Sequence, residues 1–273
     1  ASGGRRPPSL YDAGVPELPE VELVRRMLEP ALAGVRIDAV EVRRANLRIP
    51  FPAGFGDRLT GQLVMAVTRR AKYLLAALSS GETLLVHLGM SGDFRVERGA
   101  PSDPGKHDHV VFTLASGQTV TFNDPRRFGL MDLIARDGLD AHPALCELGP
   151  EPLSAEFGAA ALARACHRKK VAIKVALLDQ KVVAGVGNIY ASEALHVAGI
   201  SPKRKAAILA TRTGAPRPAA VKLAAAIVKV LTRAIDTPAS RFKVYERAGE
   251  PCSRRGCEGT IKRVVQAGRS TFY

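Results

Sequence analysis

The apolar residues of this chain of 273 residues change their spacing at residues 148–152 (LGPEP). Before this stretch, short segments alternate apolar and polar residues, which is the two-residue period of half-buried β-strands. After it, apolar residues recur every three or four positions, as they do on the buried face of an α-helix. We therefore expect a β-rich amino-terminal part and a helical carboxy-terminal part, with the boundary at these glycine and proline residues.

The amino-terminal part is expected to begin with a helix and to continue as a sheet. Residues 16–22 (PELPEVE) place two prolines before a run with helical spacing that ends at Gly34. Strand patterns follow at residues 35–43, 62–69, 73–77, 83–88, 110–114 and 119–122. The last two flank an Ala-Ser-Gly-Gln turn and predict a hairpin. Several short strands separated by glycine and proline predict a β-sandwich.

The carboxy-terminal part is expected to be helical. Helical spacing occupies residues 157–167, 171–179, 191–198 and 218–235. The last of these segments has an aliphatic face made of Val221, Ala225, Val228, Leu231 and Ile235. The fold class predicted from the two parts together is α+β.

The chain is strongly basic, with 40 Lys and Arg against 26 Asp and Glu and a net charge of +14. This balance favours a polyanionic partner or a membrane surface, and nucleic acid is preferred because no basic amphipathic helix stands out. A solvated basic surface without a partner is the alternative. No apolar run approaches the length of a membrane span, and no signal-peptide core is evident, so we expect an intracellular protein.

Candidate metal ligands are few. The four cysteines are too few for a disulfide scaffold in a chain of this length. His107 and His109 share one face of a predicted strand, but two histidines without a third ligand do not make a metal site. Cys252 and Cys257 resemble one half of a four-cysteine zinc site.

Five motifs, in the same order, resemble those of the formamidopyrimidine-DNA glycosylases, namely residues 16–22 (PELPEVE), 69–73 (RRAKY), 87–92 (HLGMSG), 124–129 (DPRRFG) and 185–193 (GVGNIYASE). Members of this family are bifunctional enzymes that excise oxidised purines from DNA. The resemblance extends from Pro16 to Tyr273. It favours the purine-excising branch over the related endonuclease VIII branch.

The resemblance implies four segments. They are a leader or misassigned start at residues 1–15, a catalytic β-sandwich domain at 16–147, a DNA-binding domain with a helix-two-turns-helix element at 148–240, and a partial, truncated zinc-ribbon β-hairpin at 241–273. Cys252 and Cys257 match the first pair of the family's four zinc ligands, so the resemblance implies one zinc ion for a complete ribbon and a metal-poor tail for half of one. Residues 236–243 are shorter than the glycine-rich loop with which the family covers the extruded base.

The resemblance makes Pro16 the nucleophile and Glu17 the acid and base. A chain that begins with proline has a free secondary amine, which titrates near pKa 8 and can attack a sugar C1′ to form a Schiff base. An internal proline has only an amide nitrogen, and fifteen residues precede Pro16 here. We expect translation to start at position 15, which reads Val15, and methionine removal to expose Pro16; a genuine leader is the alternative.

Other roles follow from the same resemblance. Lys72 is expected at the active site, in contact with the DNA backbone, and Arg269 is expected to grip the phosphates beside the lesion. Asn188 and Lys174 match phosphate ligands. His107 matches a histidine close to the DNA.

Met90, Arg126 and Phe128 match residues that fill the gap left by an extruded nucleotide. Their own chemistry agrees with this role, because apolar wedges beside an arginine can replace a missing base in the stack. In an extended loop, Arg126 and Phe128 would also point the same way. Partial burial in the core is the alternative for Met90 and Phe128.

The predicted function is base-excision DNA repair. The protein would be a DNA glycosylase and AP lyase that removes 8-oxoguanine and formamidopyrimidines and then cuts the strand by β,δ-elimination. The expected partner is double-stranded DNA with an oxidised purine or an abasic site, bound by a monomer in the cytoplasm, at the nucleoid. The alternative is an inactive DNA-binding homologue with a blocked Pro16 and an incomplete zinc site. A ribosomal or RNA-binding zinc protein would explain the charge but not the wedge residues.

Overall fold

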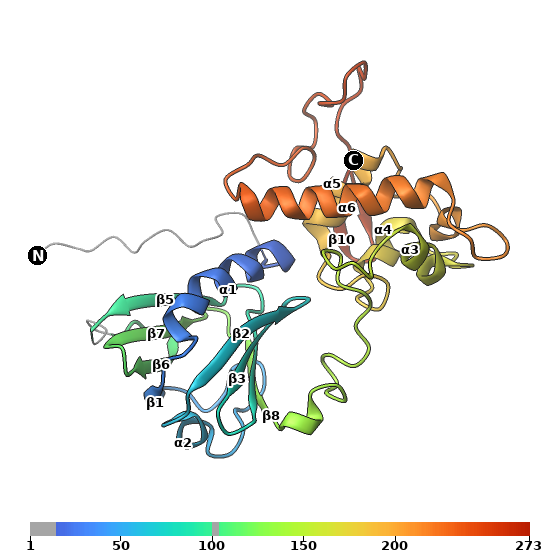
Figure 1. Ribbon diagram of the computed structural model, residues 1–273. Helices are drawn as coiled ribbons and strands as arrows, with labels where there is room; N and C mark the ends of the chain where they lie inside the picture. The colour runs from blue at the N-terminus through green and yellow to red at the C-terminus, as the bar shows by residue number, and fades with distance from the viewer. Residues whose placement is uncertain (1–14, 100–103) are drawn as a thin grey trace, which may run out of the picture. The chain divides into compact units, whose positions relative to one another are not determined.

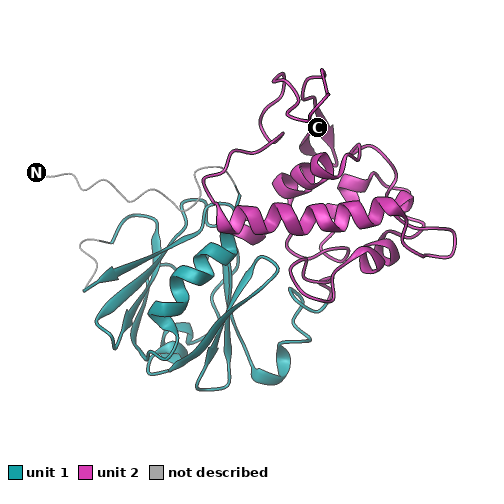
Figure 2. Cartoon of the chain, turned by 45° about the horizontal axis from the view of Figure 1, so that its top comes forward, with its two compact units in different colours: residues 1–16, 20–146 teal, residues 17–19, 147–273 magenta. Residues whose placement is uncertain are grey.

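The computed structural model describes residues 15–99 and 104–273 (Figure 1). Its contacts divide the described chain into two compact units, coloured separately in Figure 2. Unit 1 holds Val15, Pro16 and residues 20–146, and unit 2 holds residues 17–19 and 147–273. Residues 1–14 of the expected leader lie outside the described residues.

Unit 1 contains two four-stranded antiparallel sheets, with strand orders β1-β6-β7-β5 and β2-β3-β4-β8. The first sheet consists of β1 (Ile37–Val42), β5 (Asp93–Arg98), β6 (Asp108–Leu114) and β7 (Gln118–Asn123). The second consists of β2 (Val64–Arg70), β3 (Tyr73–Leu78), β4 (Thr83–His87) and β8 (Leu130–Ile134). One cluster of buried aliphatic and aromatic side chains takes members from both sheets. The predicted β-sandwich is therefore confirmed.

The spacing of apolar residues does not predict two of these strands, β5 and β8. β5 has four charged residues among six, and β8 is an apolar run interrupted by one aspartate. The short helices α2 (Phe55–Leu59) and η1 (Arg136–Gly138) are also unexpected. β6 is buried at six of its seven positions rather than at every second one, so its pairing in the middle of the sheet overrides simple alternation.

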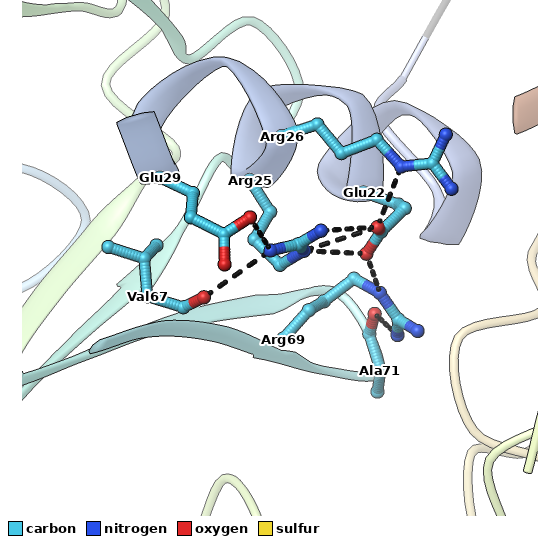
Figure 3. Close-up of polar contacts among 7 residues, drawn as sticks. All are labelled: Glu22, Arg25, Arg26, Glu29, Val67, Arg69 and Ala71. Atoms are coloured by element: carbon cyan, nitrogen blue, oxygen red, sulfur yellow. Dashed lines mark hydrogen bonds and ion pairs between the residues drawn. The ribbon is translucent and has the colours of Figure 1, made fainter. Parts of the chain in front are cut away.

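Helix α1 (Leu18–Leu32) is tied to β2 by a cluster of charged side chains (Figure 3). The Glu22 carboxylate accepts hydrogen bonds from Arg25 at 3.0 Å, from Arg26 at 3.1 Å and from Arg69 of β2 at 3.2 Å. Burial alone would raise the pKa of Glu22, but the neighbouring guanidinium groups outweigh it and lower that pKa. Arg69 also donates to the carbonyl of Ala71, in the turn that leads into β3.

Unit 2 is helical with one β-hairpin. Its elements are α3 (Ala159–Cys166), α4 (Ile173–Leu178), α5 (Asn188–Ala198), η2 (Ala206–Leu209), α6 (Pro218–Asp236), β9 (Arg263–Gln266) and β10 (Arg269–Phe272). The four predicted helices are present. α5 begins three residues earlier than its apolar spacing suggests, because the glycine-rich turn before it leads directly into the helix. The α+β fold class is confirmed.

The buried face of α6 differs from the predicted one. Leu231 and Ile235 are buried as expected, but Val221 is 56% exposed and Val228 is 37% exposed. The helix instead buries Leu223, Ala224 and Ile227 against α3 and α5, because aliphatic residues surround most of its circumference and packing alone selects the face. Within residues 15–99 and 104–273, no helix combines the length and the apolar character needed to cross a bilayer.

Two substitutions on α6 distinguish the observed face from the predicted one. Leu231→Ala is expected to lower the free energy of unfolding by about 2–5 kcal/mol, because it leaves a cavity in a fully buried site. Val228→Ala, on the exposed side of the same helix, is expected to change it by less than about 0.5 kcal/mol. Urea denaturation followed by circular dichroism measures both. Equal losses for the two variants would contradict the observed packing.

Candidate functional site

Glu17 is the best-defined polar group of the candidate site. Its side chain is buried and accepts backbone hydrogen bonds at the start of α5, from Gly187 at 2.9 Å, Ile189 at 2.9 Å and Tyr190 at 3.4 Å. The first N–H groups of a helix have no partner within the helix and attract negative charge. The carboxylate of Glu17 thus satisfies three donors at the amino end of α5.

The chain around Glu17 fits this helix end closely. The N–H of Leu18 donates to the carbonyl of Gly185 at 3.2 Å. Gly185 has φ of +80°, and a Cβ atom on it would stand 2.6 Å from the side chain of Leu18. Only glycine allows both the backbone conformation and this approach. Residues 17 and 18 therefore pack directly against the glycine-rich turn.

Lys174 lies beneath the same helix end. Its side chain is fully buried, and its ammonium group donates to Asn188 Oδ1, to the carbonyl of Ser270 at 3.1 Å and to Thr271 Oγ1 at 2.8 Å. It therefore joins α4, α5 and β10. Burial lowers the pKa of Lys174 to about 8, an effect opposed by the charge of Glu17 and reinforced by a nearby arginine of β10.

Four of the residues predicted to act together are thus associated in unit 2. Glu17, Lys174 and Asn188 meet at the start of α5, and the charge of Arg269 acts on Lys174. Arg269 is exposed at the first position of β10, whereas Asn188 is half-buried. Lys174 has no exposed surface, so its contacts in this structure support Asn188 and β10 rather than an external phosphate.

Glu193 is a second buried carboxylate at this site; it is the last residue of the 185–193 motif, but the sequence predicts no role for it. It accepts N–H groups from Lys243 at 2.8 Å, Val244 at 2.7 Å and Tyr245 at 3.0 Å. This segment precedes the β9–β10 hairpin, so Glu193 anchors to α5 the part of the chain that leads to Arg269. An acidic residue inside an otherwise apolar helix face is the sequence signal that could have found it.

Lys72 belongs to unit 1, in the turn between β2 and β3. Ala71 before it has φ of +53°, which is rare for a residue other than glycine. Nearby, burial together with the charges of Lys72 and Arg48 lowers the pKa of His87 to about 4. His87 is therefore neutral at pH 7, and its Nδ1 accepts the N–H of Gly89 at 3.0 Å.

Met90, Arg126 and Phe128 lie on two turns of unit 1 and remain exposed. Met90 is 37% exposed and Phe128 is 44% exposed. The guanidinium carbon of Arg126 is 4.9 Å from the centre of the Phe128 ring, a cation–π distance. Arg127 between them has φ of +56°, so the loop forms a turn here and is not extended. The side chains of Arg126 and Phe128 therefore meet because the chain turns between them, and not because alternate residues of an extended chain point the same way.

His107 is half-buried at the base of the second of these turns, where its carbonyl accepts the N–H of Asp124 at 2.9 Å. The next residue, Asp108, is paired with Arg95 at 2.9 Å and does not complete a metal site. Among residues 15–99 and 104–273, no three His, Cys, Asp or Glu side chains are arranged to hold a metal ion. Cys252 and Cys257 are only two ligands where zinc takes four, so the described donors do not fit a zinc ion.

Sequence comparisons match both units of the chain. The profile of the formamidopyrimidine-DNA glycosylase N-terminal domain matches residues 15–131, and that of the formamidopyrimidine-DNA glycosylase H2TH domain matches residues 148–246. Formamidopyrimidine-DNA glycosylase of Azorhizobium caulinodans is 54% identical, with 95% of this chain and 98% of that protein covered. The protein of the same name from Rhodopseudomonas palustris strain BisA53 is also 54% identical, over 94% and 98%. The first alignment spans 287 positions, more than the 273 residues here, so that relative contains residues without a counterpart in this chain.

Solved structures agree with this assignment. Lactococcus lactis Fpg bound to DNA containing an abasic site superposes with a TM-score of 0.84 at 31% identity, covering 94% of this chain and 97% of that one. The same enzyme in complex with DNA containing FAPY-dG gives a TM-score of 0.84 at 30% identity, with the same coverage. The two family profiles and these relatives place the chain in the class of DNA glycosylases. The chain belongs to the formamidopyrimidine-DNA glycosylase family.

Replacing Glu193 by glutamine tests the second carboxylate. Glutamine presents an NH₂ group to at least one of the three backbone donors, so Glu193→Gln is expected to lower the free energy of unfolding by about 1–3 kcal/mol. Hydrogen exchange at the amide of Lys243, the single donor to Oε2, should accelerate. Glu156→Gln, at an exposed glutamate, is the control and should change neither quantity. Unchanged exchange at Lys243 in Glu193→Gln would contradict the anchoring role.

The lowered pKa of Lys174 predicts a pH dependence of stability. Between about pH 8 and 10.5 the unfolded chain retains a proton that folded Lys174 has lost, so the unfolded state binds more protons and rising pH favours the folded state. The stability of the wild type relative to Lys174→Met should therefore increase across this window. Lys222→Met, at an exposed lysine of α6, should give a curve parallel to the wild type. Parallel curves for Lys174→Met as well would argue against the shift.

Proposed function

We propose that this protein excises oxidised purines, including 8-oxoguanine and formamidopyrimidines, from double-stranded DNA and then cleaves the strand as an AP lyase. Family membership, the net charge of +14 and the damaged DNA bound by the solved relatives support a DNA substrate. The observation that carries the proposal is the position of Glu17. This carboxylate accepts the N–H groups of Gly187, just before α5, and of Ile189 and Tyr190 in its first turn, and Glu17 directly follows Pro16.

The proposed chemistry needs a free amine on Pro16. Its nitrogen attacks C1′ of the damaged nucleotide, the C1′–N bond to the base breaks, and the base leaves with a proton. Glu17 assists this departure and the opening of the sugar ring as acid and base. The resulting iminium ion makes the C2′ proton acidic, so elimination first breaks the bond to the 3′ oxygen and then the bond to the 5′ oxygen.

The remaining predicted residues would hold the DNA. Asn188 and Arg269 are the proposed phosphate ligands in unit 2, and Lys72 is the proposed backbone contact in unit 1. Met90, Arg126 and Phe128 would fill the space of the extruded nucleotide. Arg126 would donate a hydrogen bond to the base on the opposite strand that has lost its partner. The exposure of all three side chains supports this role.

Zinc enters the proposal only as a structural ion. Cys252 and Cys257 would be two of the four ligands that such an ion takes. No step of the reaction above depends on it.

The competing function is DNA binding without chemistry. The observation in its favour is that Val15 precedes Pro16 in this sequence, so the Pro16 nitrogen is part of an amide. An amide nitrogen cannot form the iminium linkage. The two functions therefore differ in a single measurable product, a covalent protein–DNA adduct.

Borohydride trapping tests the proposal. A chain that begins at Pro16 is expected to become covalently linked to a duplex containing 8-oxoguanine, and the same chain with residues 1–15 attached is expected not to react. Glu17→Gln in the shorter chain should slow base excision by about 10²–10⁴-fold, as expected for loss of an acid–base group. An undamaged duplex is the control for selectivity.

The outcomes separate the two functions. Binding of damaged DNA without an adduct, by the chain that begins at Pro16, would establish the non-catalytic alternative. Equal trapping by the longer chain, with its leader intact by mass spectrometry, would show that the nucleophile is not Pro16.

A further inference from the structure

Specific contacts join the two turns of unit 1 that carry Met90, Arg126 and Phe128. The first, called the Met90 turn, comprises residues 88–92, and the second, called the Arg126 turn, comprises residues 124–129. The chain between them includes β5, β6 and β7, so neither turn determines the other through local sequence. Side-chain hydrogen bonds and close backbone packing join them.

The hydrogen bonds centre on Asp124 and Ser91. Ser91 Oγ donates to Asp124 Oδ1 at 2.6 Å and accepts the N–H of Arg126 at 3.2 Å. Asp124 Oδ2 accepts the N–H of Gly129 at 2.8 Å. One hydroxyl and one carboxylate therefore connect the middle of the Met90 turn to the middle and the end of the Arg126 turn.

The Asp124 carboxylate is itself fixed. Asp124 is fully buried, and its N–H donates to the carbonyl of His107 at 2.9 Å. Its carbonyl lies 2.8 Å from His109 Nε2, and because a carbonyl can only accept, that nitrogen carries the proton. The backbone and side chain of Asp124 are thus held at four atoms, which leaves it little freedom to follow a moving turn.

The backbones of the two turns also touch. A Cβ atom on Gly89 would stand 2.3 Å from the carbonyl carbon of Phe128, and one on Gly129 would stand 2.9 Å from the ring of Phe122. Neither position has room for a side chain. Gly89 also has φ of +66°, a conformation that favours glycine. The Met90 turn therefore packs directly on the backbone that carries Phe128.

We propose that the Asp124–Ser91 pair is a positioning device that makes Met90, Arg126 and Phe128 one rigid wedge. This inference rests on the proposed function, in which the three side chains enter the DNA stack. Two independent mobile turns would have to be ordered at the moment of insertion, and that entropy opposes binding. Turns that are already locked together avoid this cost, while their exposed side chains remain available.

Ser91→Ala is the sharper test, because Asp124 is fully buried and its replacement also challenges folding. The variant removes the donor to Asp124 and the acceptor for Arg126 but leaves the wedge residues and the proposed nucleophile intact. Ser116→Ala is the matched control, since Ser116 lies on an exposed turn of the same unit between β6 and β7.

Two substrates separate insertion from chemistry. The first is an 8-oxoguanine duplex with 2-aminopurine next to the lesion, whose fluorescence rises as the stack opens. The second is a single-stranded oligonucleotide with an abasic site, which has no stack to fill. In single-turnover reactions with chains that begin at Pro16, Ser91→Ala should slow the fluorescence rise and duplex cleavage about tenfold, the effect of one lost charge-assisted hydrogen bond. Cleavage of the single strand should stay within about twofold, and Ser116→Ala should match the wild type.

The proposal is overturned if Ser91→Ala leaves duplex cleavage unchanged, or if it slows the duplex and the single strand equally. Failure of the proposed function looks different, because the wild type itself would then form no adduct with either substrate and the wedge role would fall with it. Hydrogen exchange at the Gly129 amide is measured in the same variant without DNA. Faster exchange in Ser91→Ala supports the lock between the turns, and unchanged exchange overturns it.

Discussion

The organisation of the helical unit depends on the end of one helix. The first N–H groups of α5 have no partners within the helix, and the Glu17 carboxylate supplies acceptors for three donors there. This holds residues 17–19 at the glycine-rich turn, although some 170 positions separate Glu17 from Gly187 in the sequence. A group proposed for acid–base chemistry is therefore also a structural cap, so its geometry is maintained by the fold itself.

The same site contains a second device of the same kind. Glu193 accepts three N–H groups from the segment before the β9–β10 hairpin, and buried Lys174 joins that hairpin to Asn188. Charged groups in the interior are costly unless they are hydrogen-bonded. Glu17, Glu193 and Lys174 each make three hydrogen bonds. Burial of the Lys174 ammonium group disfavours its charged form, which is why its pKa is lowered. The hairpin that carries exposed Arg269 is thus held to the helical unit by hydrogen bonds as well as by apolar packing.

Unit 1 shows how exposed apolar side chains can be kept in place. Met90 and Phe128 gain little from burial, yet the backbones beneath them are fixed by Asp124, Ser91 and two glycines. The Glu22 cluster performs a comparable task for the end of β2, before the turn that carries Lys72. In both places, polar contacts fix the backbone next to a side chain that is proposed to contact DNA.

The family, the α+β class and the four helices expected in unit 2 could be predicted from the sequence alone, because short motifs and hydrophobic periods are local properties. The same motifs selected the candidate residues. The sequence did not determine which face of α6 is buried, since aliphatic residues surround that helix and only packing selects among them. Nor did it reveal Glu193 or the link between Ser91 and Asp124, whose partners lie tens of residues away. These contacts follow from the folded chain, because hydrogen-bond partners distant in sequence are set by chain topology rather than by any nearby residue.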